Sequence, residues 1–247
     1  MKNNISIKNK RSFKDKIGLL LFIILCLCII YVIIKIATSP SERVNADEYV
    51  KVKSDYVLML VQCLLGLAVM MIPSIIERKK AIDIPDNMEI LYFIFLYLAI
   101  VLGEVRDFYY LIPHWDIILH AFSGSMLASL GFFLVNIFND SKNIEYHLTP
   151  FFIALFSFCF ALTAGAIWEI YEYLIDGLLS LNMQKFALAD GTELVGRAAL
   201  ADTMEDIIVD ALSALAISTL GYFSLKKKDK YKAKHNAETN SKCVEVK

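Results

Sequence analysis

Long apolar runs separated by short polar segments dominate the chain, and six of them approach or reach the length of a membrane-spanning helix. Such a helix needs about 20 mostly apolar residues to cross the hydrocarbon core of a bilayer. The six runs are residues 17–35, 57–76, 89–108, 117–138, 151–175 and 206–225, and the third reaches this length only when it includes Glu104. The pattern predicts an all-α fold, a polytopic membrane helix bundle with six transmembrane helices within residues 17–225.

The composition favours the same fold class. Of the 247 residues, 57% are hydrophobic and 21% are charged, whereas ordinary soluble domains are about 45–50% apolar. The 16 Phe, 12 Tyr and 2 Trp argue against a disordered chain. Four of the five cysteines lie inside apolar runs, so we expect no disulfide framework. A net charge of −1 gives no general attraction to nucleic acid, and we expect the lipid bilayer as the main partner.

The distribution of Lys and Arg predicts the orientation of the chain in the membrane. Basic residues are concentrated in segment 1–16 and in the tail, 226–247, and loops rich in Lys and Arg stay in the cytoplasm. Both termini are therefore predicted to be cytoplasmic, as an even number of spans requires. The first apolar run is longer than the roughly 7–15 residues of a signal-peptide core, so we interpret it as an uncleaved anchor.

Several ionisable residues lie inside or at the ends of the apolar runs, where each charge costs roughly 2.5–3.5 kcal/mol at mid-membrane depth. With the predicted orientation, they all lie at one depth, near the outer surface. The residues are Glu104, Asp116, His120, Glu169, Glu172, Asp202, Asp206 and Asp210. Charged residues retained in such runs usually face a bundle interior or a water-filled cavity, so this set is a candidate functional site.

The spacing of these residues predicts that they converge in groups. A helix turns about 100° per residue, so Asp116 and His120, four apart, point within about 40° of each other. Glu169 and Glu172 share a face in the same way, and Asp202, Asp206 and Asp210 form a stripe. Acidic neighbours repel unless a cation or shared protons compensate. We therefore predict that the eight residues ligate a divalent metal ion, with oxygen ligands and one imidazole that suit Mg, Mn, Fe or Zn.

Simpler interpretations exist for individual residues. His120, alone on an apolar face, is also compatible with a hydrogen-bonded core residue. Trp115 and Trp168 suit the aromatic belt at a membrane interface. Asp202 and Asp206 also suit a solvated helix start, where acidic side chains interact favourably with the helix dipole.

Four blocks of residues together resemble a known family. They are Gly103-Glu104; His114-Trp115-Asp116 with His120 and Gly124; Trp168-Glu169 with Glu172; and Asp202-Thr203 with Asp206 and Asp210. In this order, over residues 90–222, they resemble the signature blocks of the YjdF-like bacterial inner-membrane proteins. The chain departs from that pattern at Ala201, where the family has Trp, and its outer loop lacks a Gly-Gln-Gly-Asp element. The resemblance implies a multi-pass protein of the bacterial cytoplasmic membrane with a site at these residues, and it implies no particular reaction.

Three functions are compatible with these observations. The first is a divalent-metal-dependent membrane enzyme acting on a lipid or lipid-linked substrate, with the metal activating water. The second is a cation- or proton-coupled carrier, and the third is a membrane scaffold without catalytic activity. The chain contains no Gly-x-Ser-x-Gly, no His-Glu-x-x-His and no phosphate-binding loop, so we assign no catalytic residue from the sequence.

Overall fold

The structure, a computed structural model, describes residues 12–41, 51–80, 82–139, 148–179, 181–188 and 192–245. These residues form helices and no β-strand. Six helical segments are long and apolar enough to cross a membrane: Phe13–Thr38, Lys53–Lys79, Asp86–Val105, Trp115–Ile137, Pro150–Leu179 and Ala198–Tyr231. The predicted fold class and the predicted six spans are therefore confirmed, while the cytoplasmic placement of the termini stays a prediction. Most of the predicted N-terminal segment 1–16 lies outside the described residues.

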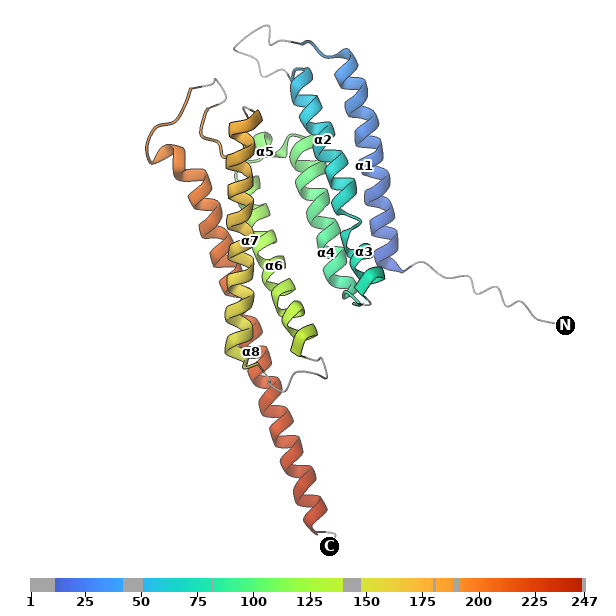
Figure 1. The fold of residues 1–247 in the computed structure, drawn as a ribbon, viewed down its shortest axis with the longest axis vertical. Helices are drawn as coiled ribbons and strands as arrows, with labels where there is room; N and C mark the ends of the chain where they lie inside the picture. Colours follow the sequence, from blue (N-terminus) through green and yellow to red (C-terminus); the bar gives the residue numbers. More distant parts are fainter. Residues whose placement is uncertain are drawn as a thin grey trace, which may run out of the picture. The chain divides into compact units, whose positions relative to one another are not determined.

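The chain divides into two compact units, Met1–Trp115 and Asp116–Lys247, and we describe each by itself. The first unit contains α1 (Phe13–Thr38), α2 (Lys53–Val69), α3 (Ile72–Lys80), α4 (Asp86–Leu96), the π-helix η1 (Tyr97–Val105) and the short α5 (Phe108–Leu111). The blue, cyan and green ribbons of Figure 1 trace these elements. Leu21, Leu25 and Phe93 form part of its apolar core, which α1 and α4 share.

The second predicted span is interrupted near its end. The sequence predicts one helix over 57–76, but α2 ends at Val69 and α3 begins at Ile72. Pro73 has no N–H, so it cannot donate the helical hydrogen bond to the carbonyl four residues earlier, that of Val69. The hydroxyl of Tyr92 donates to that carbonyl instead, at 2.8 Å. The break therefore leaves no carbonyl unpaired at this position.

The third span also differs from its prediction, 89–108. It begins at Asp86, changes from α-helix to π-helix at Tyr97 and ends at Val105. Asp107 adopts a left-handed backbone conformation, with φ at 64°, which stops the helix before α5. Within the π-helix, Gly103 lies against the ring of Tyr109, and a Cβ atom at this glycine would collide with that ring.

A partly buried ion network joins three helices at one end of the first unit. The Nζ atom of Lys14 lies 2.8 Å from Glu89 Oε2, 3.2 Å from Asp86 Oδ1 and 3.3 Å from Glu77 Oε1. Glu89 is only 4% exposed. Since Lys14 begins α1, Glu77 lies in α3 and the other two carboxylates begin α4, this lysine ties the three helix ends together.

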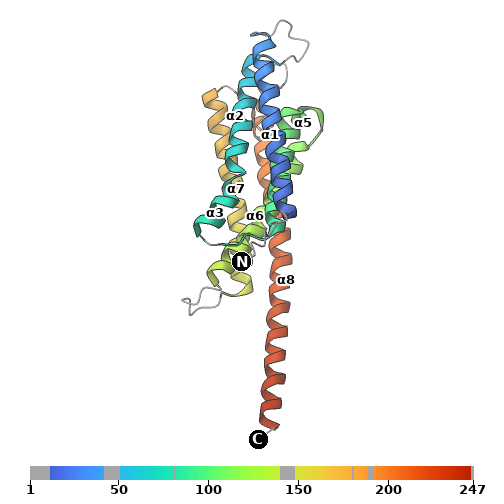
Figure 2. The ribbon, with the colours of Figure 1, turned by 90° about the vertical axis from the view of Figure 1, so that its right-hand side faces the viewer.

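The second unit is built on three long helices, α6 (Trp115–Asn139), α7 (Pro150–Leu179) and α8 (Ala201–Glu245), with a short 3-10 turn, η2 (Ala198–Leu200), before α8. Both views show α7 and α8 running beside each other (Figures 1 and 2). Small residues make the contacts: Ala128, Ala161 and Ala214 are fully buried against one another. Gly131 packs against Ser157, where a Cβ atom would come within 2.8 Å of the serine Cα. Such close approach is typical of helices packed in membranes.

The last helix continues well past the predicted span, 206–225. Helix α8 runs unbroken to Glu245, so the part of the predicted tail that the structure describes is helical. Figure 2 shows α8 extending beyond the other helices of its unit. The sequence after Gly221 is free of Gly and Pro and contains eight Lys, a residue type that favours helix. The continuation therefore follows from local propensity once the span has nucleated the helix.

Candidate metal centre

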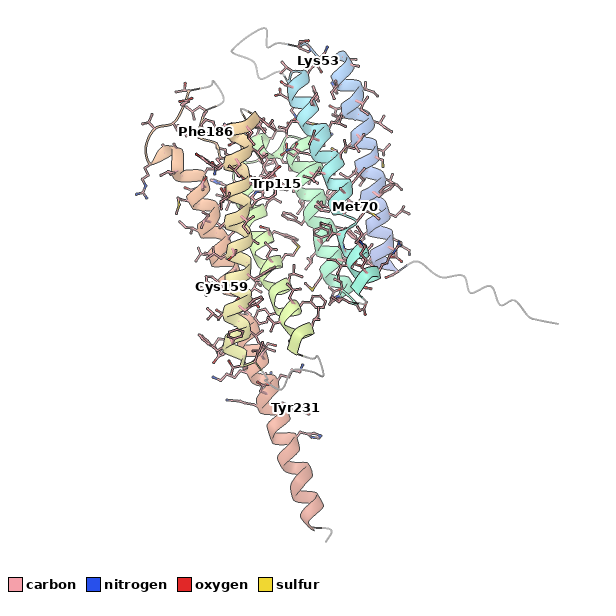
Figure 3. All side chains as sticks on the ribbon, viewed as in Figure 1. Lys53, Met70, Trp115, Cys159, Phe186 and Tyr231 are labelled. Carbon is pink, nitrogen blue, oxygen red and sulfur yellow. The ribbon has the colours of Figure 1, made fainter. Side chains whose placement is uncertain are left out.

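Seven ionisable residues gather at the end of the second unit where α6 and α8 begin and α7 ends. We call them the carboxylate–histidine cluster: Asp116, His120, Glu169, Glu172, Asp202, Asp206 and Asp210. Asp116 and His120 lie in the first turns of α6, and the three later aspartates lie in the first turns of α8. Phe186, labelled in Figure 3, marks the loop that follows α7 at this end of the unit.

His120 lies at the centre of the cluster. Its Nε2 atom is 3.7 Å from Glu169 Oε1, 3.8 Å from Asp206 Oδ2 and 3.9 Å from Asp116 Oδ1. These three oxygens come from three different helices. His120 Nε2 therefore lies within 4 Å of one carboxylate oxygen from each of the three helices.

The other nitrogen of the same ring is engaged by Asp210. His120 Nδ1 lies 3.2 Å from Asp210 Oδ2. With Asp210 as the acceptor, Nδ1 would carry the proton, and Nε2 of a neutral ring would then have a lone pair for a metal. A carboxylate behind a histidine in this way is the usual partner of a metal-ligating imidazole.

Several carboxylate oxygens of the cluster are buried without a hydrogen-bond donor among the described residues. They are Glu169 Oε1 and Oε2, Glu172 Oε2, Asp202 Oδ2, Asp206 Oδ2 and Asp210 Oδ1. The residues concerned are closely packed: Glu169 is 4% exposed, Asp206 1% and Asp210 1%. Buried carboxylates without partners are costly, so the cluster needs a compensating cation or bound protons.

Two glycines make room for Asp210. A Cβ atom on Gly165 of α7 would collide with Asp210 Oδ2, and one on Gly124 of α6 would lie 3.0 Å from the backbone oxygen of Asp210. The carboxylate behind His120 therefore occupies a space that only glycine leaves open. The close contacts with the two glycines restrict the position of Asp210. Asp210 in turn contacts the imidazole ring of His120.

Glu172 and Trp168 form a local pair on α7. The indole Nε1 of Trp168 donates to Glu172 Oε1 at 3.0 Å. Trp168 is 48% exposed, whereas Glu172 is only 5% exposed. The tryptophan therefore faces outward from α7 and also orients a carboxylate of the cluster, so the aromatic-belt interpretation describes only part of its role.

Lys185 contacts the cluster from the loop after α7, and the sequence interpretation did not include it. Its Nζ atom lies 2.8 Å from Asp116 Oδ2 and 2.8 Å from Asp202 Oδ1. Burial lowers the pKa of Lys185, but the charge of Asp116 and hydrogen bonds to Asp116 and Asp202 outweigh it and raise the pKa above its ordinary value. The side chain is therefore a permanent cation. Lys185 is 69 residues from Asp116 and 17 residues from Asp202 along the chain. Helical spacing could therefore not predict these contacts.

A second residue outside the predicted set, Asp176, holds that loop in place. Its carboxylate accepts the backbone N–H of Met183 at 2.8 Å and that of Gln184 at 3.0 Å. The side-chain amide of Gln184 in turn donates to Thr203 Oγ1 at 2.9 Å. The last turn of α7 and the first turn of α8 thus anchor the segment that presents Lys185.

Glu104, the eighth residue of the predicted metal site, belongs to the first unit. There it lies in the π-helix and accepts a hydrogen bond of 2.7 Å from Gln62 Nε2. Trp115 also packs within the first unit, edge to face on Phe108 at a ring separation of 5.0 Å. The cluster described above therefore consists of seven of the eight predicted residues, and their role as metal ligands stays a prediction.

The geometry of the cluster suits a cation of moderate hardness. One ligand atom each from Asp116, His120 and Asp206 lies within 4.8 Å of the others. A set of carboxylate oxygens with one imidazole fits Mg, Mn, Fe or Zn better than a soft metal such as Cu(I), which favours sulfur. The four cysteines with described side chains, Cys26, Cys28, Cys63 and Cys159, are all outside the cluster.

Comparison with known proteins places the chain among membrane proteins. Residues 17–227 match the family described as "Predicted membrane protein (DUF2238)". An uncharacterized protein of Thermotoga maritima is 28% identical over 151 residues, which cover 61% of this chain and 69% of that protein. No solved structure matches. The expected resemblance to an uncharacterised membrane protein family is thus confirmed. Since the match extends over most of the chain and includes every residue of the cluster, this multi-pass membrane protein belongs to the DUF2238 family.

Proposed function

We propose that the protein is a divalent-metal-dependent enzyme of the bacterial cytoplasmic membrane that acts on a lipid or lipid-linked substrate at the outer leaflet. The observation that carries this proposal is the set of buried carboxylate oxygens without donors around His120 Nε2. Asp116, His120, Glu169 and Asp206 would hold the ion.

The distances around His120 are close to those of a metal coordination sphere. Two ligand atoms that each lie about 2.1 Å from one metal are about 3.0–3.5 Å apart in tetrahedral or octahedral geometry. The separations of 3.7–3.9 Å between Nε2 and the three oxygens exceed this range by about 0.2–0.9 Å. The carboxylates would have to move toward Nε2 to close the sphere, and Asp210 contacts the other ring nitrogen.

A metal held there would act as a Lewis acid toward an ester or phosphate oxygen and would activate water. We assign the accompanying proton transfer to Glu172. Its Oε1 atom is fixed by Trp168, and its Oε2 atom is buried without a donor among the described residues. A carboxylate held in this way has one oxygen free to accept a proton.

A lipid substrate is favoured by the exposed side chains near the cluster. Trp168, Tyr171 and Tyr173 on the same stretch of α7 are 48%, 39% and 68% exposed. Trp and Tyr concentrate at the level of the lipid headgroups, so these residues support an interfacial depth for the cluster. Leu188, Val195 and Leu200 add exposed apolar surface in the loop before α8. A substrate whose apolar part stays in the bilayer could reach the metal from this interface.

One observation weighs against the alternative of a carrier. Carriers commonly bind their substrates where transmembrane helices are discontinuous. In this structure α6 and α8 begin at the cluster and α7 ends near it, and none of the three is interrupted between its ends. The site is thus supported by rigid helices, which suits catalysis more than alternating access.

Elemental mass spectrometry of the purified protein tests the metal site. We expect close to one divalent ion per chain, and only trace metal in Asp116→Asn and Asp206→Asn. Glu205→Gln is the matched control, because Glu205 lies on the same turn of α8 but is exposed, so it should keep its metal. Equal trace metal in all four proteins would refute the proposal.

The reaction is tested separately from the metal. Purified protein loaded with Mn²⁺ should turn over at least one class of lipid ester or lipid phosphate in detergent, and Glu172→Gln should lose that activity while retaining metal. Cation flux in proteoliposomes without any turnover would instead identify a carrier.

A further inference from the structure

Lys185 bridges two carboxylates that belong to different helices. Its ammonium lies 2.8 Å from Asp116 Oδ2 on α6 and 2.8 Å from Asp202 Oδ1 on α8. The other oxygen of Asp116 faces His120 Nε2 at 3.9 Å, and the other oxygen of Asp202 is buried without a donor among the described residues. Asp116 is therefore shared between the position in front of His120 and the position of the ammonium.

The segment that carries Lys185 is held in a defined conformation. Asp176 accepts two backbone N–H groups at its start. Asn182 closes it further on, donating to the Ala187 carbonyl at 2.7 Å and accepting the Ala187 N–H at 2.9 Å. Lys185 itself has a left-handed backbone, with φ at 47°, which is unfavourable for a residue with a side chain. A lysine placed at such a cost has a specific partner, in contrast to an ordinary surface lysine.

This arrangement resembles a two-metal site in which one position is filled by a side chain. In two-metal enzymes the ions lie about 3.5–4 Å apart and share ligands. Here a carboxylate shared by two neighbouring cation positions is already present, and the ammonium contacts two oxygens from two helices in the second position. The six carboxylates of the cluster outnumber its one histidine and the contacting Lys185, so each position has excess negative charge to offset.

We propose that Lys185 acts as a built-in cation that limits the centre to one divalent ion, and that its removal creates a second metal site formed by Asp116 and Asp202. This inference rests on the proposed metal site in front of His120 for its first ion. The second ion would be a hard divalent cation, because the two residues offer only carboxylate oxygens.

Metal stoichiometry distinguishes this role from that of a simple loop tether. Full-length protein is equilibrated with Mn²⁺ alone, and bound metal is counted by elemental mass spectrometry. We expect one ion in the unaltered protein and two in Lys185→Met and Lys185→Gln. Lys185→Arg keeps the charge and should bind one ion. The double variant Lys185→Met/Asp202→Asn removes a ligand of the new site and should also return to one ion.

Electron paramagnetic resonance gives a second measurement on the same samples. Two Mn²⁺ ions that share Asp116 should show an exchange-coupled spectrum, whereas one ion shows the simple six-line pattern. Lys226→Met, which removes an exposed lysine of α8, is the control for the loss of one positive charge, and its spectrum should not change.

The possible results separate this inference from the proposed function. One ion in both the unaltered protein and the Lys185 variants would overturn the inference and leave the proposed metal site standing. No ion in the unaltered protein and one in Lys185→Met would overturn both the proposed site and the inference, which needs a first ion in front of His120. No ion in any protein, or two in the unaltered protein, would overturn the inference.

Discussion

At the scale of single residues, the position of Asp210 depends on two glycines, because a Cβ atom at either one would come too close to it. Its carboxylate lies against Gly165, its backbone lies against Gly124, and its Oδ2 atom is 3.2 Å from His120 Nδ1. A partner behind a ligating histidine typically changes metal affinity by about 10–100-fold when it is disturbed. The glycines therefore act on the proposed site without contacting a metal.

Substitution of Gly165 tests this dependence. In Gly165→Ala the new methyl group would collide with Asp210 Oδ2 and displace the carboxylate from the imidazole. We expect the affinity for Mn²⁺ to fall about 10–100-fold, measured by isothermal titration calorimetry on purified protein. Gly177→Ala is the control, because it lies on the same helix and its new methyl group would have no atom within 4 Å. Equal affinity in Gly165→Ala and the control would contradict this role.

The cluster could be predicted in part from the sequence. Helical spacing placed Asp116 beside His120, and it placed Asp202, Asp206 and Asp210 along one face, because these contacts are local. Lys185 and Asp176 could not be found in this way, since their contacts depend on the path of a loop. Glu104 was included because of its predicted depth alone, and it belongs to the other unit with Gln62 as a partner.

At the scale of helices, local sequence explains where several elements depart from a simple span. Pro73 lies where the second span is interrupted and cannot donate a hydrogen bond to the Val69 carbonyl. The Tyr92 hydroxyl donates to that carbonyl instead. No comparable signal in the sequence predicted the π-helix from Tyr97 to Val105. Within it, Gly103 packs against the ring of Tyr109, a contact between residues six apart that helical periodicity does not predict.

The ion network at the start of α1 makes a prediction about the stability of the first unit. In Lys14→Met the buried carboxylate of Glu89 would lose a cation at 2.8 Å. Breaking one half of a buried ion pair costs about 3–5 kcal/mol, and the partial exposure of Lys14 argues for a value near the lower limit. Unfolding in mixed detergent micelles measures the change. Lys16→Met, an exposed neighbour on the same helix, should have almost no effect, and equal stability of both variants would contradict the network's role.

At the scale of the whole molecule, the predicted orientation has a direct test. A cysteine introduced at Val195, which is 86% exposed, should react with a membrane-impermeant maleimide from outside intact cells. A cysteine at Asp229, on the described part of α8 beyond the predicted span, should react only after the membrane is permeabilised. The opposite labelling pattern would show that the carboxylate–histidine cluster faces the cytoplasm, and the proposed substrates would then have to come from the inner leaflet.

The alanine and glycine contacts among α6, α7 and α8 bear on how this protein can be studied. Helices that associate through close backbone approach are held by dispersion forces, which do not require surrounding water. Detergent micelles, like lipid bilayers, surround the helices with an apolar environment. We therefore expect the packing of α6, α7 and α8 to survive extraction in a mild detergent. Metal counted in a solubilised sample should therefore report on a second unit that is still folded.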